Sequence, residues 1–275
     1  MRWSTGMATF LGEKIGEGAF ADIHAWAPGQ VLKLFKAGIS EPVARHEARM
    51  TRAVFAVGAP APEVFDEVSL EGRFGIALTR FEAPTLLQLS RSGAITFEQT
   101  GTILASVCIS VHKTPPPPEV PLLRDWMSGT LGLLGGALPK HIAVGTLSLI
   151  ERLPSGDGLC HCDLHPGNVI MTAAGPRIID WDGAVRAPAA LDIGCCHISL
   201  SELAPEVVDN PARPRAVNVA FQSEYARRVG TSPAALNAAA KPYLPIARVH
   251  LAAGAAPAQR KRLIQHVEEY LRSGD

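Results

Sequence analysis

Two polar stretches near the middle of the chain decide its fold: HCDLHPGN at residues 161–168 and IIDWD at residues 178–182. They place Asp163, then Asn168 five residues later, then Asp180 after a further twelve. Apolar runs adjoin both stretches, so we expect a hairpin that brings two carboxylates and an amide close together. Phosphoryl transfer needs this set, because a carboxylate must orient the attacking hydroxyl or accept its proton and oxygen atoms must hold the Mg²⁺ that bridges the nucleotide phosphates. The spacing therefore indicates a phosphoryl-transfer site.

A glycine turn lies nearer the amino terminus, in IGEGAFADI at residues 15–23. Gly16 and Gly18 would let backbone N–H groups approach a phosphate without a Cβ in the way. An ordinary tight hairpin uses glycine as well, so this turn alone does not establish nucleotide binding. A dinucleotide-binding loop is disfavoured, because a strand and not a helix is predicted to follow the turn.

A lysine interrupts the apolar run VLKLF at residues 31–35. On a strand, Lys33 shares a face with Val31 and Phe35, and an unpaired ammonium on a buried face is costly. Glu47, on the helix predicted next in the chain, is the candidate partner. A lysine that points to solvent is the commoner arrangement on strands, and the sequence leaves both open.

The order of the predicted elements gives the fold class. In the first eighty or so residues we expect antiparallel strands at residues 10–15, 21–26, 31–35, 64–68 and 74–80, and a helix at 43–57 that Ser40 caps. Farther along we expect helices at 86–89, 97–112 and 131–153 with interruptions, a hairpin at 168–171 and 177–179, and helices from 191 to the end. The predicted fold is α+β with two lobes, residues 1–82 and 83–275, joined by a hinge at about residues 79–85.

The composition excludes several classes of protein. The 275 residues carry 26 Lys and Arg against 26 Asp and Glu, so the chain has no basic excess of the kind that binds nucleic acid. A hydrophobic content of 47% supports a folded core, and no apolar run is long enough to span a bilayer. The five cysteines fit reduced thiols in a cytosolic protein. We expect no nucleic-acid or membrane partner, and the oligomeric state stays open.

Together, the HxDxxxxN and IDWD elements, the glycine turn and the strand lysine resemble the aminoglycoside phosphotransferase and choline kinase group, which shares the protein kinase fold. The resemblance extends from Ile15 to about Asp192. It implies a small antiparallel N-terminal lobe with one main helix and a mostly helical C-terminal lobe. It also implies Mg²⁺ as cofactor and ATP as phosphoryl donor, with GTP as the alternative.

The same resemblance implies roles for individual residues. Asp163 would be the catalytic base, and Asn168 and Asp180 would hold Mg²⁺. Lys33 would contact the α- and β-phosphates, with Glu47 as its partner on the helix. The other nucleotide contacts would come from Gly16, Gly18 and the hinge backbone at Arg80 and Phe81.

Departures from the protein kinase pattern favour a small-molecule acceptor. Asp180-Trp181-Asp182 stands where a protein kinase has Asp-Phe-Gly, no Ala-Pro-Glu element follows, and Ala21 replaces the third glycine of the turn. We therefore expect phosphoryl transfer to a hydroxyl of an aminoglycoside, amino alcohol, sugar or similar molecule. Residues 201–275 hold ten basic and seven acidic residues, which does not favour a polycation. A catalytically silent nucleotide-binding module and a protein kinase are the alternatives.

Polar residues around these motifs have simpler explanations. Cys160, His161, Cys162 and His165 offer zinc-ligand chemistry, but the two cysteines are too closely spaced for the usual zinc knuckle. We expect His161 to be structural and the pair Cys195-Cys196 to be buried thiols. Asp192 begins a helical run, so we expect it to be an N-cap, whereas the resemblance implies that it braces the catalytic loop.

Overall fold

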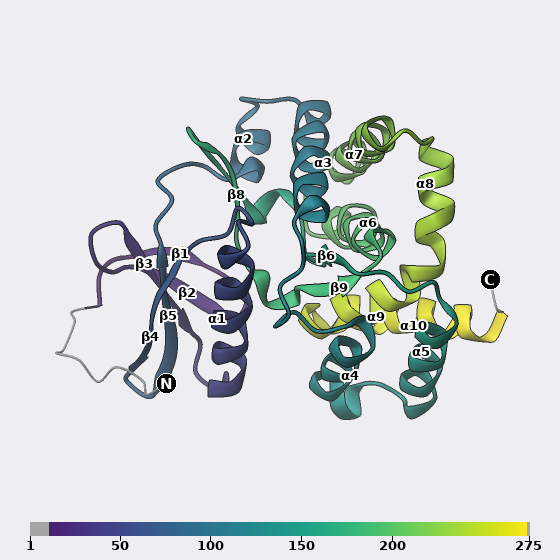
Figure 1. Ribbon diagram of the computed structural model, residues 1–275, viewed down its shortest axis with the longest axis horizontal. Helices are drawn as coiled ribbons and strands as arrows, with labels where there is room; N and C mark the ends of the chain where they lie inside the picture. The colour runs from purple at the N-terminus through teal and green to yellow at the C-terminus, as the bar shows by residue number, and fades with distance from the viewer. Residues whose placement is uncertain (1–10, 274–275) are drawn as a thin grey trace. The chain divides into compact units, whose positions relative to one another are not determined.

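The computed structural model describes residues 11–273 (Figure 1). Its contacts group into two compact units. The first unit holds the chain up to Pro84 together with Ile170–Asp182, and the second holds Thr85–Val169 and the chain from Gly183 onward. Each unit is described by itself below.

In the described part of the first unit, an antiparallel sheet has the strand order β1-β2-β3-β5-β4. The strands are β1 (Lys14–Glu17), β2 (Ala21–Ala25), β3 (Gln30–Phe35), β4 (Val64–Leu70) and β5 (Arg73–Thr79), and helix α1 (Glu41–Ala56) follows β3. Between β4 and β5, Glu71 and Gly72 have φ angles of 51° and 73°, which is the turn chemistry expected of a tight hairpin.

The first strand differs from its prediction. It was expected at residues 10–15, and residue 10 lies outside the described part, but β1 begins only at Lys14. Its pairing with β2 shifts register between Lys14 and Gly16. The extra residue makes a β-bulge inside this edge strand.

Alternation along β3 divides its side chains between two apolar clusters. Leu32 and Leu34 pack with Val68 on one face of the sheet. Phe35 packs on the other face, with Ala44 and Ala48 of α1 among its neighbours. Lys33 lies on the Phe35 side, as predicted, with its Nζ 5.7 Å from the Phe35 ring centroid.

The second unit is mostly helical in its described part. Its α-helices are α2 (Leu86–Ser92), α3 (Phe97–Lys113), α4 (Leu123–Leu134), α5 (Lys140–Arg152), α6 (Ala189–Ile198), α7 (Ala212–Val229), α8 (Pro233–Ala240), α9 (Leu244–Gly254) and α10 (Pro257–Ser273). Capping boxes at Thr85 with Gln88 and at Thr96 with Gln99 fix where α2 and α3 begin. None of the helices described in the chain has the length and apolar character needed to cross a bilayer.

Short strands complete the middle of the chain. The predicted hairpin is present as β7 (Val169–Thr172) and β8 (Gly175–Ile178). The sequence did not indicate β6 (Gly158–Cys160), which pairs with β9 (Val185–Ala187). The helical stretch predicted at 131–153 begins earlier, at Leu123, and breaks at Gly135, whose φ is 47°. A positive φ suits glycine and ends a helix.

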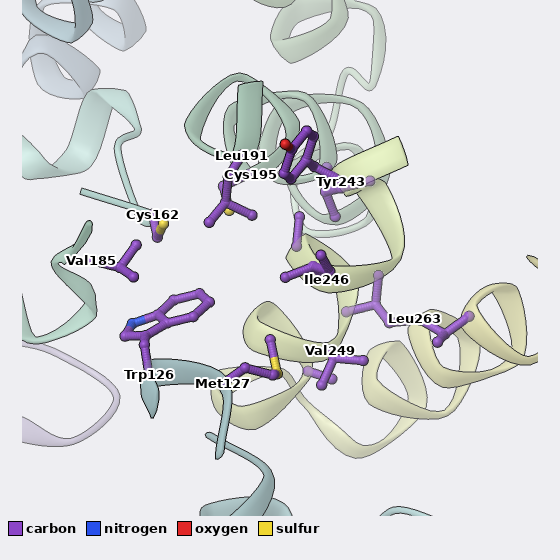
Figure 2. Packing of buried hydrophobic residues seen from close by; sticks show 14 of the residues in the cluster. Trp126, Met127, Cys162, Val185, Leu191, Cys195, Tyr243, Ile246, Val249 and Leu263 are labelled. Carbon is purple, nitrogen blue, oxygen red and sulfur yellow. The ribbon is translucent and has the colours of Figure 1, made fainter. Parts of the chain in front are cut away.

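The core of the second unit lies between α4, α6, α9 and α10 (Figure 2). Trp126 and Met127 of α4 contribute side chains to it, together with Leu191 of α6 and Ile246 of α9. The indole Nε1 of Trp126 donates a hydrogen bond to the carbonyl of Gly183, 3.0 Å away. The polar end of the tryptophan is thus satisfied inside an apolar core.

Close packing of α3 on α7 leads to the first prediction. A Cβ on Gly101 would lie 2.5 Å from the Val217 carbonyl oxygen and 2.7 Å from the Phe221 nitrogen. We therefore expect Gly101→Ala to lower the free energy of unfolding by about 1–3 kcal/mol, measured by urea denaturation. Gly129→Ala is the matched control, because nothing lies within 4 Å of its Cβ, and it should stabilise α4 by about 0.5–1 kcal/mol. Equal effects of the two substitutions would contradict this packing.

A buried imidazole leads to the second prediction. The ring of His250 lies 4.3 Å from that of Trp126, and burial lowers the pKa of His250 from 6.5 to about 4. Between about pH 4 and pH 6.5, this histidine therefore carries a proton in the unfolded chain but not in the native protein. This histidine should contribute stability that is complete above about pH 6.5 and is lost as the pH falls through about 4, by up to about 3 kcal/mol.

Substituting His250→Phe keeps the ring on Trp126 and removes the titration. Urea denaturation between pH 4 and 7 should show a shallower loss of stability with acid in this variant than in the unsubstituted protein. Identical pH slopes for the two proteins would refute the assignment.

Candidate active site

Lys33 lies between two carboxylates of the first unit. Its Nζ is 2.6 Å from Oε1 of Glu47 on α1 and 2.7 Å from Oδ1 of Asp180. The Lys33 side chain is 13% exposed and that of Glu47 only 6%. The ammonium is thus paired rather than solvated, and the pairing with Glu47 predicted from the sequence is present.

Charge in this cluster is predominantly negative. Burial opposes the charged form of Lys33, but Glu47, Asp180 and Asp182 together outweigh burial and raise the Lys33 pKa. Burial raises the pKa of Glu47 to about 7; Lys33 opposes that rise, and the two aspartates add to it. One ammonium faces three carboxyl groups, so the cluster would attract a further cation.

The backbone holds Asp180 in an unusual conformation. Its φ is 62°, in the left-handed region that residues other than glycine seldom adopt. Trp181, fully buried, follows it and donates from Nε1 to the carbonyl of Ile178 at 2.9 Å. This anchor fixes the turn and keeps the Asp180 carboxylate on Lys33. Strained residues of this kind are concentrated at functional sites.

In the second unit, Asp163 and Asn168 are hydrogen-bonded to one another. Nδ2 of Asn168 donates to the Asp163 carbonyl at 2.9 Å and to the Asp163 carboxylate at 3.2 Å. Nδ1 of His161 accepts from the Asp163 N–H at 3.2 Å, and His161 is fully buried. His161 therefore shapes the loop from inside, in agreement with its predicted structural role.

The side chain of Asp192 holds this loop by hydrogen bonds to its backbone. It is fully buried, and its carboxylate accepts hydrogen bonds from the N–H groups of His161 at 3.0 Å and Cys162 at 2.8 Å. The N-cap prediction for Asp192 is wrong, because α6 begins at Ala189, with Pro188 at the cap, so Asp192 lies inside the first turn. The alternative implied by the family resemblance, that it braces the loop, agrees with these contacts.

His112 on α3 was not predicted and completes the support. Its Nε2 lies 3.1 Å from Asp192 Oδ2, and its Nδ1 lies 2.8 Å from the Tyr225 hydroxyl. Burial opposes ionisation of Asp192, but the hydrogen bond and charge of His112 and the His161 N–H outweigh burial and lower the Asp192 pKa. An ionised carboxylate only accepts hydrogen bonds, so Nε2 of His112 carries a proton.

The remaining predicted nucleotide contacts lie at strand ends of the first unit. Gly16 pairs with Ile23 in the β1–β2 ladder, and the Gly18 N–H closes the turn on the Ala21 carbonyl at 2.8 Å. Arg80 follows β5 and donates its N–H to the Gly29 carbonyl at 2.9 Å, with Phe81 next in the chain. The structure gives their positions, and their nucleotide roles stay predictions.

The cysteines behave as buried thiols. All five are unpaired and buried, as was expected for Cys195 and Cys196. Among the described residues, the group with metal-ligand spacing is Cys108, His112 and Asp192, so the structure does not gather Cys160, His161, Cys162 and His165 as a zinc set. Burial raises the pKa of Cys108 well above its usual value, which disfavours the thiolate that a metal needs.

The amino-acid sequence of the chain was compared with models of protein families and with curated proteins. A sequence model described as the phosphotransferase enzyme family matches residues 23–229 of the chain. The chain belongs to the phosphotransferase enzyme family. The match includes Lys33, Glu47, Asp163, Asn168 and Asp180 and confirms the family predicted from the motifs. No curated protein sequence matches the chain.

Solved structures of small-molecule kinases share the fold. A Plasmodium vivax ethanolamine kinase is similar with a TM-score of 0.61 and 14% identity, over 95% of this chain and 82% of that one. An aminoglycoside-3'-phosphotransferase of type VIII has a TM-score of 0.56 and 17% identity, over 86% of this chain and 94% of that one. An amicoumacin kinase in complex with AMP-PNP and Ca²⁺ has a TM-score of 0.56 and 12% identity, over 95% and 88%. The predicted kinase-like α+β fold is therefore confirmed.

The buried support of the loop leads to the third prediction. Asp192→Asn keeps the shape of the side chain, but one of the two backbone N–H groups now faces an amide NH₂ and loses its acceptor. We expect the free energy of unfolding to fall by about 1–3 kcal/mol in guanidinium denaturation. The exposed Asp209→Asn is the matched control and should change it by less than about 0.5 kcal/mol. An unchanged denaturation midpoint in Asp192→Asn would contradict the bracing role.

Proposed function

We propose that this family member transfers the γ-phosphoryl group of ATP to a hydroxyl of a small molecule in an Mg²⁺-dependent reaction. The observation that carries the proposal is the position of Lys33 between Glu47 and Asp180. A buried ammonium with fixed carboxylate partners presents its positive charge in one defined place. Phosphate oxygens of a nucleotide need such a charge where negative charge spreads in the transition state.

The residues of the site fit a hard cation such as Mg²⁺. Asp180 and Asn168 offer a carboxylate and an amide oxygen, and Mg²⁺ takes oxygen ligands. Asn168 uses its amide nitrogen for Asp163, which directs the amide oxygen elsewhere. The three carboxyl groups around Lys33 supply the excess of negative charge. When bound, the ion would neutralise charge on the β- and γ-phosphates.

The protein's own groups would then perform the transfer. Asp163 would hold the acceptor hydroxyl by a hydrogen bond to its carboxylate and take the hydroxyl proton as the oxygen attacks the γ-phosphorus. Lys33 would hold the phosphates from the ADP side, and Glu47 would keep the lysine side chain in place. The backbone at Arg80 and Phe81 would meet the purine, and GTP is the alternative donor.

The glycine turn supports a phosphate-binding role. A Cβ on Gly18 would lie 3.4 Å from the Ala21 carbonyl oxygen, which is ordinary contact, and neither Gly16 nor Gly18 has a positive φ. The fold itself therefore does not require glycine at Gly18. A ligand that approaches the backbone closely gives a reason for it.

We propose a nucleotide-binding lobe at residues 1–82 and a catalytic and acceptor-binding lobe at 83–275, although contacts group Ile170–Asp182 with the first unit. Amino alcohols, sugars and aminoglycosides are the candidate acceptors, and the ten basic against seven acidic residues of 201–275 make a polycation the least favoured. The five free cysteines fit a reducing compartment, so we place the enzyme in the cytoplasm.

The fourth prediction tests the proposed base. Asp163→Asn keeps the hydrogen bonds of the loop but cannot accept a proton, so we expect kcat to fall by about 10²–10⁴-fold. The dissociation constant for ATP with Mg²⁺ should change little. The assay is ADP release with Mg²⁺-ATP against a panel of aminoglycosides, amino alcohols, sugars and hydroxyamino acids.

The exposed Asp209→Asn serves as the control and should keep full turnover. Undiminished turnover in Asp163→Asn would refute the catalytic assignment. A protein that binds Mg²⁺-ATP but releases ADP with none of the acceptors would favour the silent nucleotide-binding module, and phosphate transfer to protein alone would favour a protein kinase.

A further inference from the structure

A pocket lies in the second unit, on elements that carry none of the proposed catalytic residues. Its volume is about 290 Å³, at the small end of the range for ligand sites. It is lined by His197 of α6, by Asn237, Ala238 and Ala240 of α8, and by Lys241 and Leu244 at the start of the next turns. Helix α6 packs on both α8 and α9, and Figure 1 shows α8 next to α6.

Two buried amide side chains determine which ring nitrogen of His197 carries the proton. Nδ1 of His197 accepts hydrogen bonds from Nδ2 of Asn218 and Nε2 of Gln222, each at 3.1 Å. A nitrogen that accepts two hydrogen bonds carries no proton, so the neutral ring bears its proton on Nε2. Burial lowers the pKa of His197, and the Arg248 charge lowers it further against the opposing effect of Glu202. At neutral pH the residue is therefore a neutral donor.

The network behind His197 is polar and complete. Asn218 is 5% exposed and Gln222 8%, and burying such amides is costly unless each atom is bonded. Asn218 also donates to Ser201 Oγ at 2.8 Å, and Asn237 donates to Gln222 Oε1 at 3.0 Å. The Nε2–H of His197 is a donor that no other described atom of this network uses.

The chain leaves the regular α-helical geometry of α6 next to this network. The helix passes into a π-helical segment, Ser199–Leu203, which supplies Ser201 to Asn218 and Glu202 to Arg248, 2.7 Å away. π-Helical turns cost stability and occur frequently at functional sites.

We infer that this pocket binds a small organic carboxylate. The carboxylate oxygens would accept from His197 Nε2–H and pair with the Lys241 ammonium, the one cation in the lining. Ala238, Ala240 and Leu244 would bury a short apolar body. Asn237 uses its amide nitrogen for Gln222, so its oxygen is the acceptor that the pocket offers.

Benzoate is the probe, and benzamide is its uncharged counterpart. Titration of the full chain, followed by the imidazole ¹⁵N resonances of His197, should show saturable benzoate binding with a dissociation constant of about 1 mM or below. The free protein should show a proton on Nε2 of His197. Benzamide should bind at least about tenfold more weakly, because it lacks the charge that pairs with Lys241.

Lys241→Met should weaken benzoate binding about tenfold or more. Lys241 is exposed, so this variant should fold, as its thermal midpoint will show. Lys261→Met, an equally exposed lysine on α10, is the control and should bind benzoate as the unsubstituted protein does. Absence of saturable binding, equal binding of benzamide, equal weakening by the two lysine variants, or a proton on Nδ1 of His197 would each overturn the inference.

Discussion

Asp192 carries a charge that no water reaches, and two backbone N–H groups and one imidazole hold it. A buried carboxylate is tolerated only when hydrogen bonds and a nearby proton replace its hydration. Those partners are the N–H groups at positions 161 and 162, so satisfying Asp192 fixes the loop that carries Asp163. Cys162, directly before Asp163, has a φ of 63°, a conformation that persists only where surrounding contacts impose it. The buried charge of Asp192 and the shape of the loop that carries Asp163 are therefore set by the same hydrogen bonds.

In the first unit the buried charge is a lysine, and several carboxylates surround it. Lys33 is surrounded by more negative charge than it can balance, and the excess is stable only because Asp180 and Asp182 are partly open to solvent. Stability alone does not explain this cluster, since apolar residues in place of the buried charged groups would avoid the free-energy cost of desolvating them. The proposed site for a cation and phosphate oxygens would account for it, because the two additions compensate each other's charge. The pocket at His197 differs again, because its polar network is complete and offers a single donor.

Local chemistry made much of the fold predictable. Short apolar runs indicated the strands, and one lysine in such a run raised Glu47 as its candidate partner, which the structure shows. The sequence could not show contacts between distant elements: His112 and Asp192 are 80 residues apart, and His197, Asn218 and Asn237 lie on three helices. Two strands of three residues, β6 and β9, are too short for a period, and α4 begins after Leu122 without a side-chain cap. Such features depend on tertiary packing, which overrides weak local signals.

The central claim is that Asp180 and Lys33 form part of a metal–nucleotide site. Calorimetric titration of ATP into the full chain, with Mg²⁺ and again with EDTA, tests it without knowledge of the acceptor. The account predicts that Mg²⁺ tightens ATP binding by about tenfold or more and that Asp180→Asn removes this gain, while the exposed Asp209→Asn keeps it. No binding of ATP or GTP, or binding that is the same in Mg²⁺ and EDTA, would contradict it.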